Sequence, residues 1–355
     1  MSEDILKFLE SKKPFIDDII RKYIPEKIDE GYVEWAFGKA RYAYDVDALN
    51  KSIAEPLWDF LNRGGKRWRP ALFLLVAEAL GADIEKIKDF AVVPELIHNG
   101  SIMTDDVEDM GEMRRGKPCT HKIFGTDIAI NTGNMMYFLP LLSFIKNKDK
   151  FDAQTLLRAY DAYSEEMINI SLGQATDIWW HKGRKDNITK EQYLQMCANK
   201  TGCLSRLSAR LAVILSEGTK EQEEKLGNFA EILGIAFQIQ DDTLSVIGDK
   251  FAAKKGYGDD ITEGKRSLIV IHALEKASNE DKEKLISILD EHTRDPEKIS
   301  KAIEILKKYG SVEYAKELAR NLMKKAWEDI NPLLPESDAK KKIKALADFS
   351  IEREI

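Results

Sequence analysis

Apolar residues recur at steps of three and four along most of the chain, which is the spacing of one face of an α-helix. Strand-like alternation and Asn-Gly hairpin signals are scarce. The pattern predicts an all-α protein with helices at about 5–23, 47–61, 68–80, 87–112, 126–146, 152–181, 189–216 and 219–248, and several shorter ones after 265. Pro94 should kink the fourth of these helices or start it afresh.

No linker rich in Gly, Pro or Ser and no internal repeat divides the sequence, so we expect residues 1–355 to form a single large helical domain. A chain of 355 residues with 43% hydrophobic content can bury a sizeable core. The strongest apolar runs, at 71–80 and 137–145, are too short for a transmembrane segment, and the N-terminus lacks the apolar core of a signal peptide. Three cysteines without metal-ligand spacing favour reduced thiols, so we predict a cytoplasmic protein.

Charge narrows the choice of partner. The chain has 54 basic and 61 acidic residues, a net charge of −7, and neither sign accumulates in a long block. A nucleic-acid partner is therefore not expected. An acidic substrate would need local basic patches.

The stretch TDDVEDMGEMRRGKP (104–118) packs acidic residues close to basic ones. Asp105 and Asp109 are four residues apart, which on a helix places both carboxylates on one face, with Asp106 to the side. Magnesium prefers one or two protein carboxylates together with phosphate oxygens. The pair therefore suits a Mg²⁺ ion completed by a bound diphosphate, although alone it is more often a solvated face.

A second acidic pair strengthens this interpretation. Asp241 and Asp242 end a long and almost wholly apolar helix, where charge is unfavourable unless a metal ion or another partner meets it. The two pairs could face each other across a helix bundle.

Basic residues gather in three places that suit diphosphate binding: GGKRWRP (64–70), RRGKP (114–118) and KKGYGDDITEGKRS (254–267). Arginine forks bind phosphate oxygens bidentately, and lysine serves as a point charge. Each cluster alone would more often be solvated surface.

Together these segments resemble the trans-isoprenyl diphosphate synthases, the polyprenyl synthetase family, and among them geranylgeranyl diphosphate synthase. The motifs GGKRWRP, LIHNGSIMTDDVEDMGEMRRGKP (96–118), GQATDI (173–178), KTG (200–202), FQIQDD (237–242) and GDDITEGKRS (258–267) carry the resemblance. It implies an all-α bundle of the isoprenoid synthase type. It also implies a homodimeric, Mg²⁺-dependent prenyltransferase that joins isopentenyl diphosphate to an allylic diphosphate head to tail (1′-4).

The resemblance also implies roles for individual residues. It assigns about two or three Mg²⁺ ions to the carboxylates Asp105, Asp106, Asp109, Asp177, Asp241 and Asp242. The allylic diphosphate would be bound by Arg114, Lys200, Lys255 and Lys265. The diphosphate of isopentenyl diphosphate would be bound by Lys66, Arg69, His98 and Arg115. Gln174 lines the cavity, and Thr201 and Gln238 present oxygen dipoles to a developing allylic cation. The expected catalytic set is Asp105, Asp109, Arg114, Lys200, Thr201, Gln238 and Asp241.

The sequence departs from the family pattern at a few positions. Ser245 stands where the second motif usually has a third aspartate, which predicts an altered or relaxed metal site rather than an inactive one. Asn134 replaces a frequent aspartate, and Thr104 a common histidine. In isolation His98, Gln174 and Asp177 would more often be ordinary core or surface residues, and only the surrounding motifs change that.

Product length depends, in the family, on side chains one and two turns before the first aspartate motif. Here these are Ile97, Gly100 and Ser101. Because no aromatic residue stands at Gly100, we expect a channel that is open at this depth and geranylgeranyl diphosphate as the product. Farnesyl diphosphate is an alternative, as is a C25 or longer product if Ile97 and Met135, Met136 and Phe138 of the facing helix do not close the channel.

Two other classes stay open at this point. A type I terpene cyclase also uses an aspartate motif with Mg²⁺, but GGKRWRP and the paired arginines argue against it because a cyclase binds no isopentenyl diphosphate. A non-catalytic subunit of a heteromeric prenyl synthase rests only on Ser245.

Overall fold

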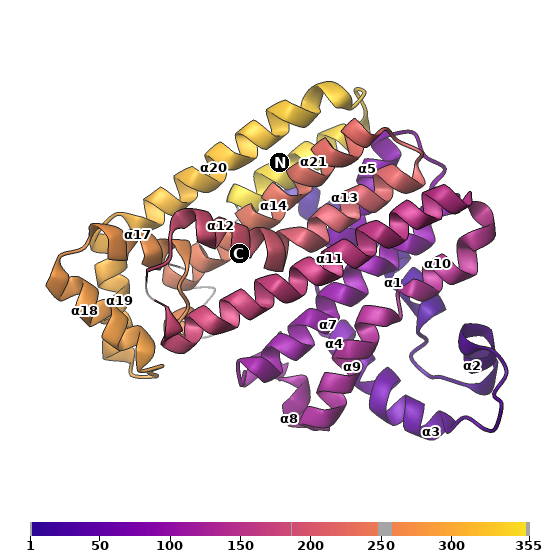
Figure 1. Cartoon of the computed structure of the whole chain (residues 1–355), viewed down its shortest axis with the longest axis horizontal. Helices are drawn as coiled ribbons and strands as arrows, with labels where there is room; N and C mark the ends of the chain where they lie inside the picture. The colour runs from indigo at the N-terminus through magenta and orange to yellow at the C-terminus, as the bar shows by residue number, and fades with distance from the viewer. Residues whose placement is uncertain (1, 186, 248–257, 353–355) are drawn as a thin grey trace.

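The computed structural model describes residues 2–185, 187–247 and 258–352, and these are almost entirely helical (Figure 1). The first segment holds α1 (Ser2–Tyr23), α2 (Glu30–Phe37), α3 (Val46–Leu49), the π-helical turn η1 (Asn50–Ala54), α4 (Glu55–Asn62), α5 (Trp68–Ala79), α6 (Ile84–Ile87) and the 3-10 turn η2 (Lys88–Ala91). The all-α prediction is confirmed.

The middle of the chain begins with α7 and ends with α13. Its elements are α7 (Val92–Glu108), the strands β1 (Met113–Arg114) and β2 (Lys117–Pro118), α8 (Thr120–Phe124), α9 (Thr126–Phe138), α10 (Leu141–Asn147), η3 (Lys148–Lys150), α11 (Ala153–Trp179), the π-helical turn η4 (Trp180–Arg184), α12 (Lys190–Cys197), the π-helical turn η5 (Ala198–Gly202) and α13 (Cys203–Leu215).

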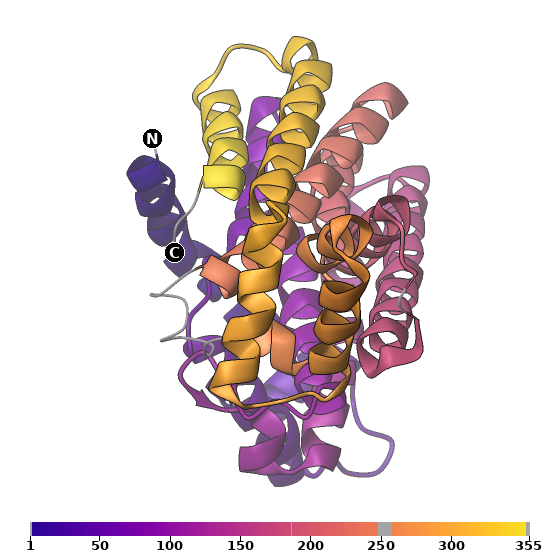
Figure 2. The same cartoon turned by 90° about the vertical axis from the view of Figure 1, so that its left-hand side faces the viewer.

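The last part holds α14 (Lys220–Ile247), α16 (Asp259–Thr262), α17 (Leu268–Lys276), α18 (Asn279–Asp290), α19 (Pro296–Lys308), α20 (Ser311–Ile330), η6 (Asn331–Leu333) and α21 (Asp338–Glu352). The long helices α20, α14, α13 and α11 lie side by side in that order, and in the turned view of Figure 2 the bundle runs from the bottom toward the top of the picture. α17, α18 and α19 cover one end of it.

The centre of the bundle is formed by α5 and α13, whose side chains are buried almost all round. α13 packs against α5, α11 and α14. A helix that is apolar all round is one that has neighbours on every side, which explains why these two sequences lack a polar face.

The predicted helix at 87–112 is broken into α6, η2 and α7, and α7 restarts two residues before Pro94. This is one of the two outcomes expected of that proline. After α7 the chain forms a two-residue hairpin, in which Met113 pairs with Pro118 and Arg114 with Lys117. Arg115 and Gly116 at its tip both have positive φ, as in a type I′ turn. The sequence pattern did not predict these strands, because two residues are too few to show alternation.

The stretch Thr126–Lys150 is, among the described residues, the one helical region long and apolar enough to cross a membrane by length and composition. Half of its most apolar window is buried inside the protein. Burial of that kind is typical of a core helix.

A buried arginine fixes the loop before α5. Arg67 Nε donates to Asp17 of α1 at 2.8 Å, and Nη1 donates to Glu95 of α7 at 2.9 Å. Its side chain also donates to the carbonyl oxygens of Leu61 and Gly64. The N-terminal helix, which carries no motif, is thereby attached to the loop that contains Lys66.

Arg67→Met should destabilise the fold by about 3–5 kcal/mol, because it leaves the buried carboxylate of Glu95 and the partly buried carboxylate of Asp17 without their cation. Urea unfolding followed by circular dichroism measures this loss. Lys51→Met, which removes an exposed pair with Glu55, serves as the control and should change the free energy of unfolding by less than about 0.5 kcal/mol. A loss below about 1 kcal/mol for Arg67→Met would contradict the structural role of this arginine.

Candidate active site

A cavity of about 810 Å³ opens among α5, α7, α9, α11, α12, η5 and α14, with the hairpin arginines and residues 260–267 at its rim. It gathers side chains from seven segments that are distant in the sequence. Carboxylates and cations are both present, on different parts of the wall. This arrangement brings together most of the residues that the motifs predicted.

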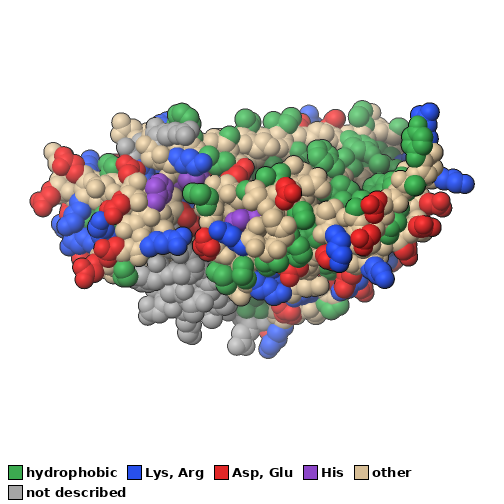
Figure 3. All heavy atoms as spheres, turned by 90° about the horizontal axis from the view of Figure 1, so that it is seen from below, with side chains coloured by type: hydrophobic (Ala, Val, Ile, Leu, Met, Phe, Trp, Pro, Cys, Tyr) green, Lys and Arg blue, Asp and Glu red, His purple; other side chains and the backbone are tan. Residues whose placement is uncertain are grey.

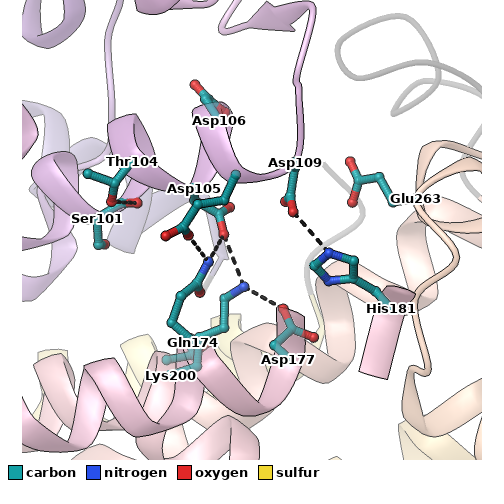
Figure 4. Close-up of polar contacts among 12 residues, drawn as sticks. Ser101, Thr104, Asp105, Asp106, Asp109, Gln174, Asp177, His181, Lys200 and Glu263 are labelled. Carbon is teal, nitrogen blue, oxygen red and sulfur yellow. Dashed lines mark hydrogen bonds and ion pairs between the residues drawn. The ribbon is translucent and has the colours of Figure 1, made fainter. Parts of the chain in front are cut away.

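The acidic part of the wall begins at the C-terminal end of α7. Asp105 accepts hydrogen bonds from Gln174 Nε2 at 2.7 Å and from Lys200 Nζ at 3.1 Å (Figure 4). Burial alone would raise the pKa of Asp105, but the charge of Lys200 and the hydrogen bond from Gln174 outweigh it and lower that pKa. Asp105 is therefore an anion in the cavity.

Asp109 follows on the same face, and burial together with the charge of Asp105 raises its pKa to about 7. His181 Nε2 lies 3.5 Å from Asp109 Oδ1, and Figure 4 shows Glu263 on the same side of Asp109 as His181, away from Asp105. The motifs did not predict His181 or Glu263 as site residues. The signals were present, because His181 follows Asp177 by one helical turn and Glu263 lies inside GDDITEGKRS.

Lys200 connects this wall to α11. Its Nζ donates to Asp177 Oδ2 at 2.5 Å as well as to Asp105. A Cβ added to Gly173 would lie 2.3 Å from the backbone nitrogen of Lys200. Only glycine at this position of α11 lets η5 approach closely enough for Lys200 to reach both carboxylates.

Asp106 was predicted as a metal ligand, and the structure places it elsewhere. Its carboxylate points away from the cavity and accepts from Arg114 Nε at 2.8 Å and Nη2 at 2.6 Å. The physical reason is its position one residue after Asp105, which turns it about 100° around the helix toward the hairpin. In this structure Asp106 thus holds Arg114 and does not line the cavity, and its role as a metal ligand stays a prediction.

The second acidic pair lies on α14. Asp241 and Asp242 both line the cavity. Asp242 accepts from Tyr193 OH at 2.7 Å and from Gln238 Nε2 at 2.8 Å, and Thr201 Oγ1 donates to Gln238 Oε1 at 3.0 Å. Burial, with the nearby charge of Asp260, raises the pKa of Asp242 to about 7. Both aspartates thus face the cavity, and Asp242 is held there by its neighbours.

Ser245, the departure from the family pattern, donates from Oγ to the backbone oxygen of Asp242 at 2.8 Å, within its own helix. It is not among the described residues that line the cavity. Lys265, which was predicted to bind the allylic diphosphate, does line it and pairs with Asp260 at 3.0 Å and Glu263 at 2.6 Å. The predicted site residue Lys255 lies outside the described residues.

The cationic part of the wall consists of Lys66, Arg69, His98, Arg114 and Arg115. Burial is the main reason that the pKa values of Arg69 and Arg115 are each lowered to about 10. Burial and the neighbouring arginines lower the pKa of His98 well below its ordinary value, so its imidazole is neutral. Arg69 Nε is buried and has no hydrogen-bond partner among the described residues. Cations crowded together in this way favour a polyanionic ligand.

Gly100 and Ile97, which the sequence assigned to the chain-length channel, are not among the residues that line this cavity, so their role in chain length stays a prediction. A Cβ on Gly100 would lie 2.8 Å from both the carbonyl oxygen of Gly133 and Cβ of Met136. Gly100 therefore faces α9 in a close helix–helix contact. An aromatic residue there would force the two helices apart instead of forming a channel floor. Ser101 does line the cavity.

On the facing helix the cavity is lined by Asn134 and Tyr137. Tyr137 OH and Thr104 Oγ1 are 2.8 Å apart, and Tyr163 donates to the backbone oxygen of Tyr137. Met136 is fully buried and Phe138 is 65% exposed. Thus Tyr137, which lies between two of the residues that we considered, is the one that faces the cavity.

The acidic wall fits Mg²⁺ if the protein supplies only part of the coordination shell and other ligands complete it. Among the described residues no group of three His, Cys, Asp or Glu side chains could hold a metal ion. Asp105 and Asp109 on α7 and Asp241 on α14 offer carboxylate oxygens, which Mg²⁺ prefers, and leave positions for other ligands. Burial and repulsion from Asp105 raise the pKa of Asp109. A divalent cation between these carboxylates would offset both effects.

Comparisons with known proteins agree with this arrangement. The chain is 34% identical over 337 residues to a short chain isoprenyl diphosphate synthase of Methanothermobacter thermautotrophicus, which covers 95% of this chain and 98% of that protein. It is 32% identical over 304 residues to a geranylgeranyl diphosphate synthase of Saccharolobus solfataricus, covering 85% and 91% of the two chains.

The fold is similar to the crystal structure of a geranylgeranyl pyrophosphate synthetase from Pyrococcus horikoshii. The TM-score is 0.85 at 33% identity, and the match covers 99% of each chain. A model of the polyprenyl synthetase family matches residues 50–306, which contain every motif identified in the sequence. The chain therefore belongs to the polyprenyl synthetase family.

Proposed function

We propose that this protein catalyses the Mg²⁺-dependent head-to-tail condensation of isopentenyl diphosphate with an allylic diphosphate. Membership of the family makes it a prenyltransferase. The observation that carries the detailed proposal is the division of one cavity into an acidic wall and a cationic wall. Two diphosphates can bind there side by side, one through metal ions and the other directly through cations.

The allylic diphosphate belongs at the acidic wall. Asp105, Asp109 and Asp241 would hold about two or three Mg²⁺ ions, which when bound neutralise the charge that develops on the leaving diphosphate. Lys200 and Lys265 stand beside these carboxylates and donate to the same diphosphate. Arg114, held by Asp106, lies at the border between the two walls.

Isopentenyl diphosphate belongs at the cationic wall. Lys66, Arg69 and Arg115 supply charge, and the neutral His98 supplies a hydrogen bond. Arg115 Nη1 donates to the backbone oxygen of Gly64 at 2.8 Å, which ties the hairpin to the GGKRWRP loop. The cations of two separate segments are thus held together before the substrate arrives.

The reaction then follows from charge and position. The allylic C–O bond ionises, and its electron pair leaves with the diphosphate. Thr201 and Gln238, which are hydrogen-bonded to each other, turn oxygen dipoles toward the allylic cation. The cation alkylates the double bond of isopentenyl diphosphate, and the released diphosphate accepts the proton that is lost. The enclosed wall excludes water, which would otherwise quench the cation.

We also propose a homodimer. Exposed apolar side chains occur on each of α9, α10 and α11: Ile130, Phe138, Ile145, Leu157, Ile168, Leu172 and Trp179. Figure 3 shows hydrophobic side chains gathered on the right-hand half of the underside, the side on which α10 lies in Figure 1. An exposed apolar surface of this kind favours association with a second copy. The cytoplasmic location and the single domain stay predictions.

For the product we propose geranylgeranyl diphosphate, with Tyr137, which lines the cavity, as the residue that limits chain length. Its ring comes from α9, and its hydroxyl group meets Thr104 of α7 across the channel. The Gly100–Gly133 contact keeps the two helices close at this depth. Chain length is then limited by one ring on the facing helix rather than by a side chain of α7.

Purified protein incubated with Mg²⁺, isopentenyl diphosphate and an allylic primer should form a longer prenyl diphosphate, and EDTA should abolish it. Asp105→Asn or Asp241→Asn should reduce turnover at least about a hundredfold, because each removes a ligand that acts in the transition state. The exposed Asp149→Asn is the control. Near-normal turnover of either variant would contradict the metal role. Hydrocarbons formed from the primer alone would indicate a terpene cyclase. The absence of any product would indicate a non-catalytic partner subunit.

Arg115→Gln should raise the KM for isopentenyl diphosphate about tenfold or more, whereas Arg114→Gln should chiefly raise the KM for the allylic substrate. The reason is that Arg115 joins the GGKRWRP loop while Arg114 joins the first aspartate motif. Steady-state kinetics with each substrate varied in turn measures this split. The double variant Asp106→Asn, Arg114→Gln controls for the carboxylate left unpaired. Equal effects of both arginines on both substrates would contradict the assignment.

Tyr137→Ala should lengthen the main product by at least one C5 unit, since it removes the ring that ends the channel. Products are dephosphorylated and sized by chromatography. Phe138→Ala, on the exposed side of the same helix, is the matched control and should leave the length unchanged. An unchanged product from Tyr137→Ala, or a wild-type product of C15, would refute this account of chain length.

A further inference from the structure

The segment 63–69 carries four cations, and the structure holds them in two different ways. Arg63 pairs with Asp59, and Arg67 pairs with Asp17 and Glu95. Neither of these arginines lines the cavity. They attach the loop to the rest of the fold.

The other two cations, Lys66 and Arg69, line the cavity and stand over aromatic rings. Lys66 Nζ lies 5.1 Å from the ring centroid of Phe349, and the guanidinium carbon of Arg69 lies 4.4 Å from that of Trp68. Both distances are within the range of a cation–π interaction. The cations at the cavity are thus seated on rings.

These rings form one continuous stack. Trp68 and Phe237 are stacked, with ring centroids 4.4 Å apart and planes inclined by 21°. Phe237 and Phe349 follow at 6.2 Å, inclined by 62°. The stack joins α5, α14 and α21 and ends at Lys66 on one side and Arg69 on the other.

A ring face holds a cation differently from a carboxylate. The attraction comes from the quadrupole of the ring, so this contact leaves the charge of the ammonium group in place and uses none of its N–H donors. Lysine also has a long and flexible stem, and a fixed seat reduces the freedom that it would lose on binding a phosphate. Phe349 suits this purpose because it is itself only 3% exposed and is held by its neighbours.

We propose that Phe349 is a positioning residue, which seats Lys66 for the diphosphate of isopentenyl diphosphate. The inference rests on the proposed function. Phe349 lies in the C-terminal helix α21, beyond residue 306, where the match to the family model ends. α21 packs on α1, α5 and α14. This helix, which has no motif of its own, thereby becomes part of the substrate site.

Phe349→Met keeps an apolar side chain of similar volume but removes the ring. It should raise the KM for isopentenyl diphosphate about five- to tenfold, with kcat and the KM for the allylic substrate within about twofold of wild type. Phe349→Tyr, which restores a ring, should return the KM to within about twofold. Phe229→Met is the matched control, because Phe229 is equally buried on α14 and packs on Trp327, away from the cavity. It should lower Tm without changing either KM.

A double variant shows whether Phe349 acts through Lys66. In a Lys66→Met background, the added Phe349→Met change should alter the KM for isopentenyl diphosphate by less than about twofold. A full independent increase would overturn the proposal, as would an unchanged KM in folded Phe349→Met or an equal increase in Phe229→Met. If Phe349→Met does not fold, Phe349→Leu replaces it, with the Kd for isopentenyl diphosphate alone measured by calorimetry. Wild-type protein without condensation activity would refute the proposed function, whereas active wild type with these negative results refutes only the role of Phe349.

Discussion

The ammonium group of Lys200 is the interaction on which the acidic side of the cavity depends. It meets Asp105 of α7 at 3.1 Å and Asp177 of α11 at 2.5 Å, and its own position on η5 depends on the close approach that Gly173 allows. A single charge therefore fixes the positions of α7, α11 and η5 relative to one another. Without it, the carboxylates that must stand close enough to share metal ions would repel one another in a buried site.

Each wall of the cavity is electrostatically unfavourable by itself. Burial and a neighbouring aspartate raise the pKa of Asp109 and of Asp242, and burial is the main cause that lowers the pKa of Arg69 and of Arg115. In both sets the charged form is therefore disfavoured. Local rules of stability are commonly broken in this way at functional sites. A ligand that brings anionic groups to one wall and metal ions to the other relieves both at once.

The helical fold and the motif residues could be predicted because helix periodicity and short motifs are local properties of the sequence. The sequence could not indicate which element packs against each face of a helix. Asp106 was assigned to the metal because the hairpin that brings Arg114 to it is too short to recognise. Gly100 was assigned to the channel because the position of α9 was unknown. Phe349 lies more than a hundred residues from the nearest residue of its aromatic stack, so no spacing rule connects them.

The π-helical turn η5 separates α12 from α13 and carries Lys200 and Thr201. A π-turn contains one residue more than an α-turn, and this surplus rotates the following helix by about 100° relative to the preceding one. Deletion of any one residue between 198 and 202 would keep the composition of the segment nearly unchanged but turn α13 and the cavity-facing residues out of phase. In this part of the chain, the number of residues is therefore constrained as well as the identity of Lys200, because an insertion or a deletion would displace every cavity-facing residue that follows.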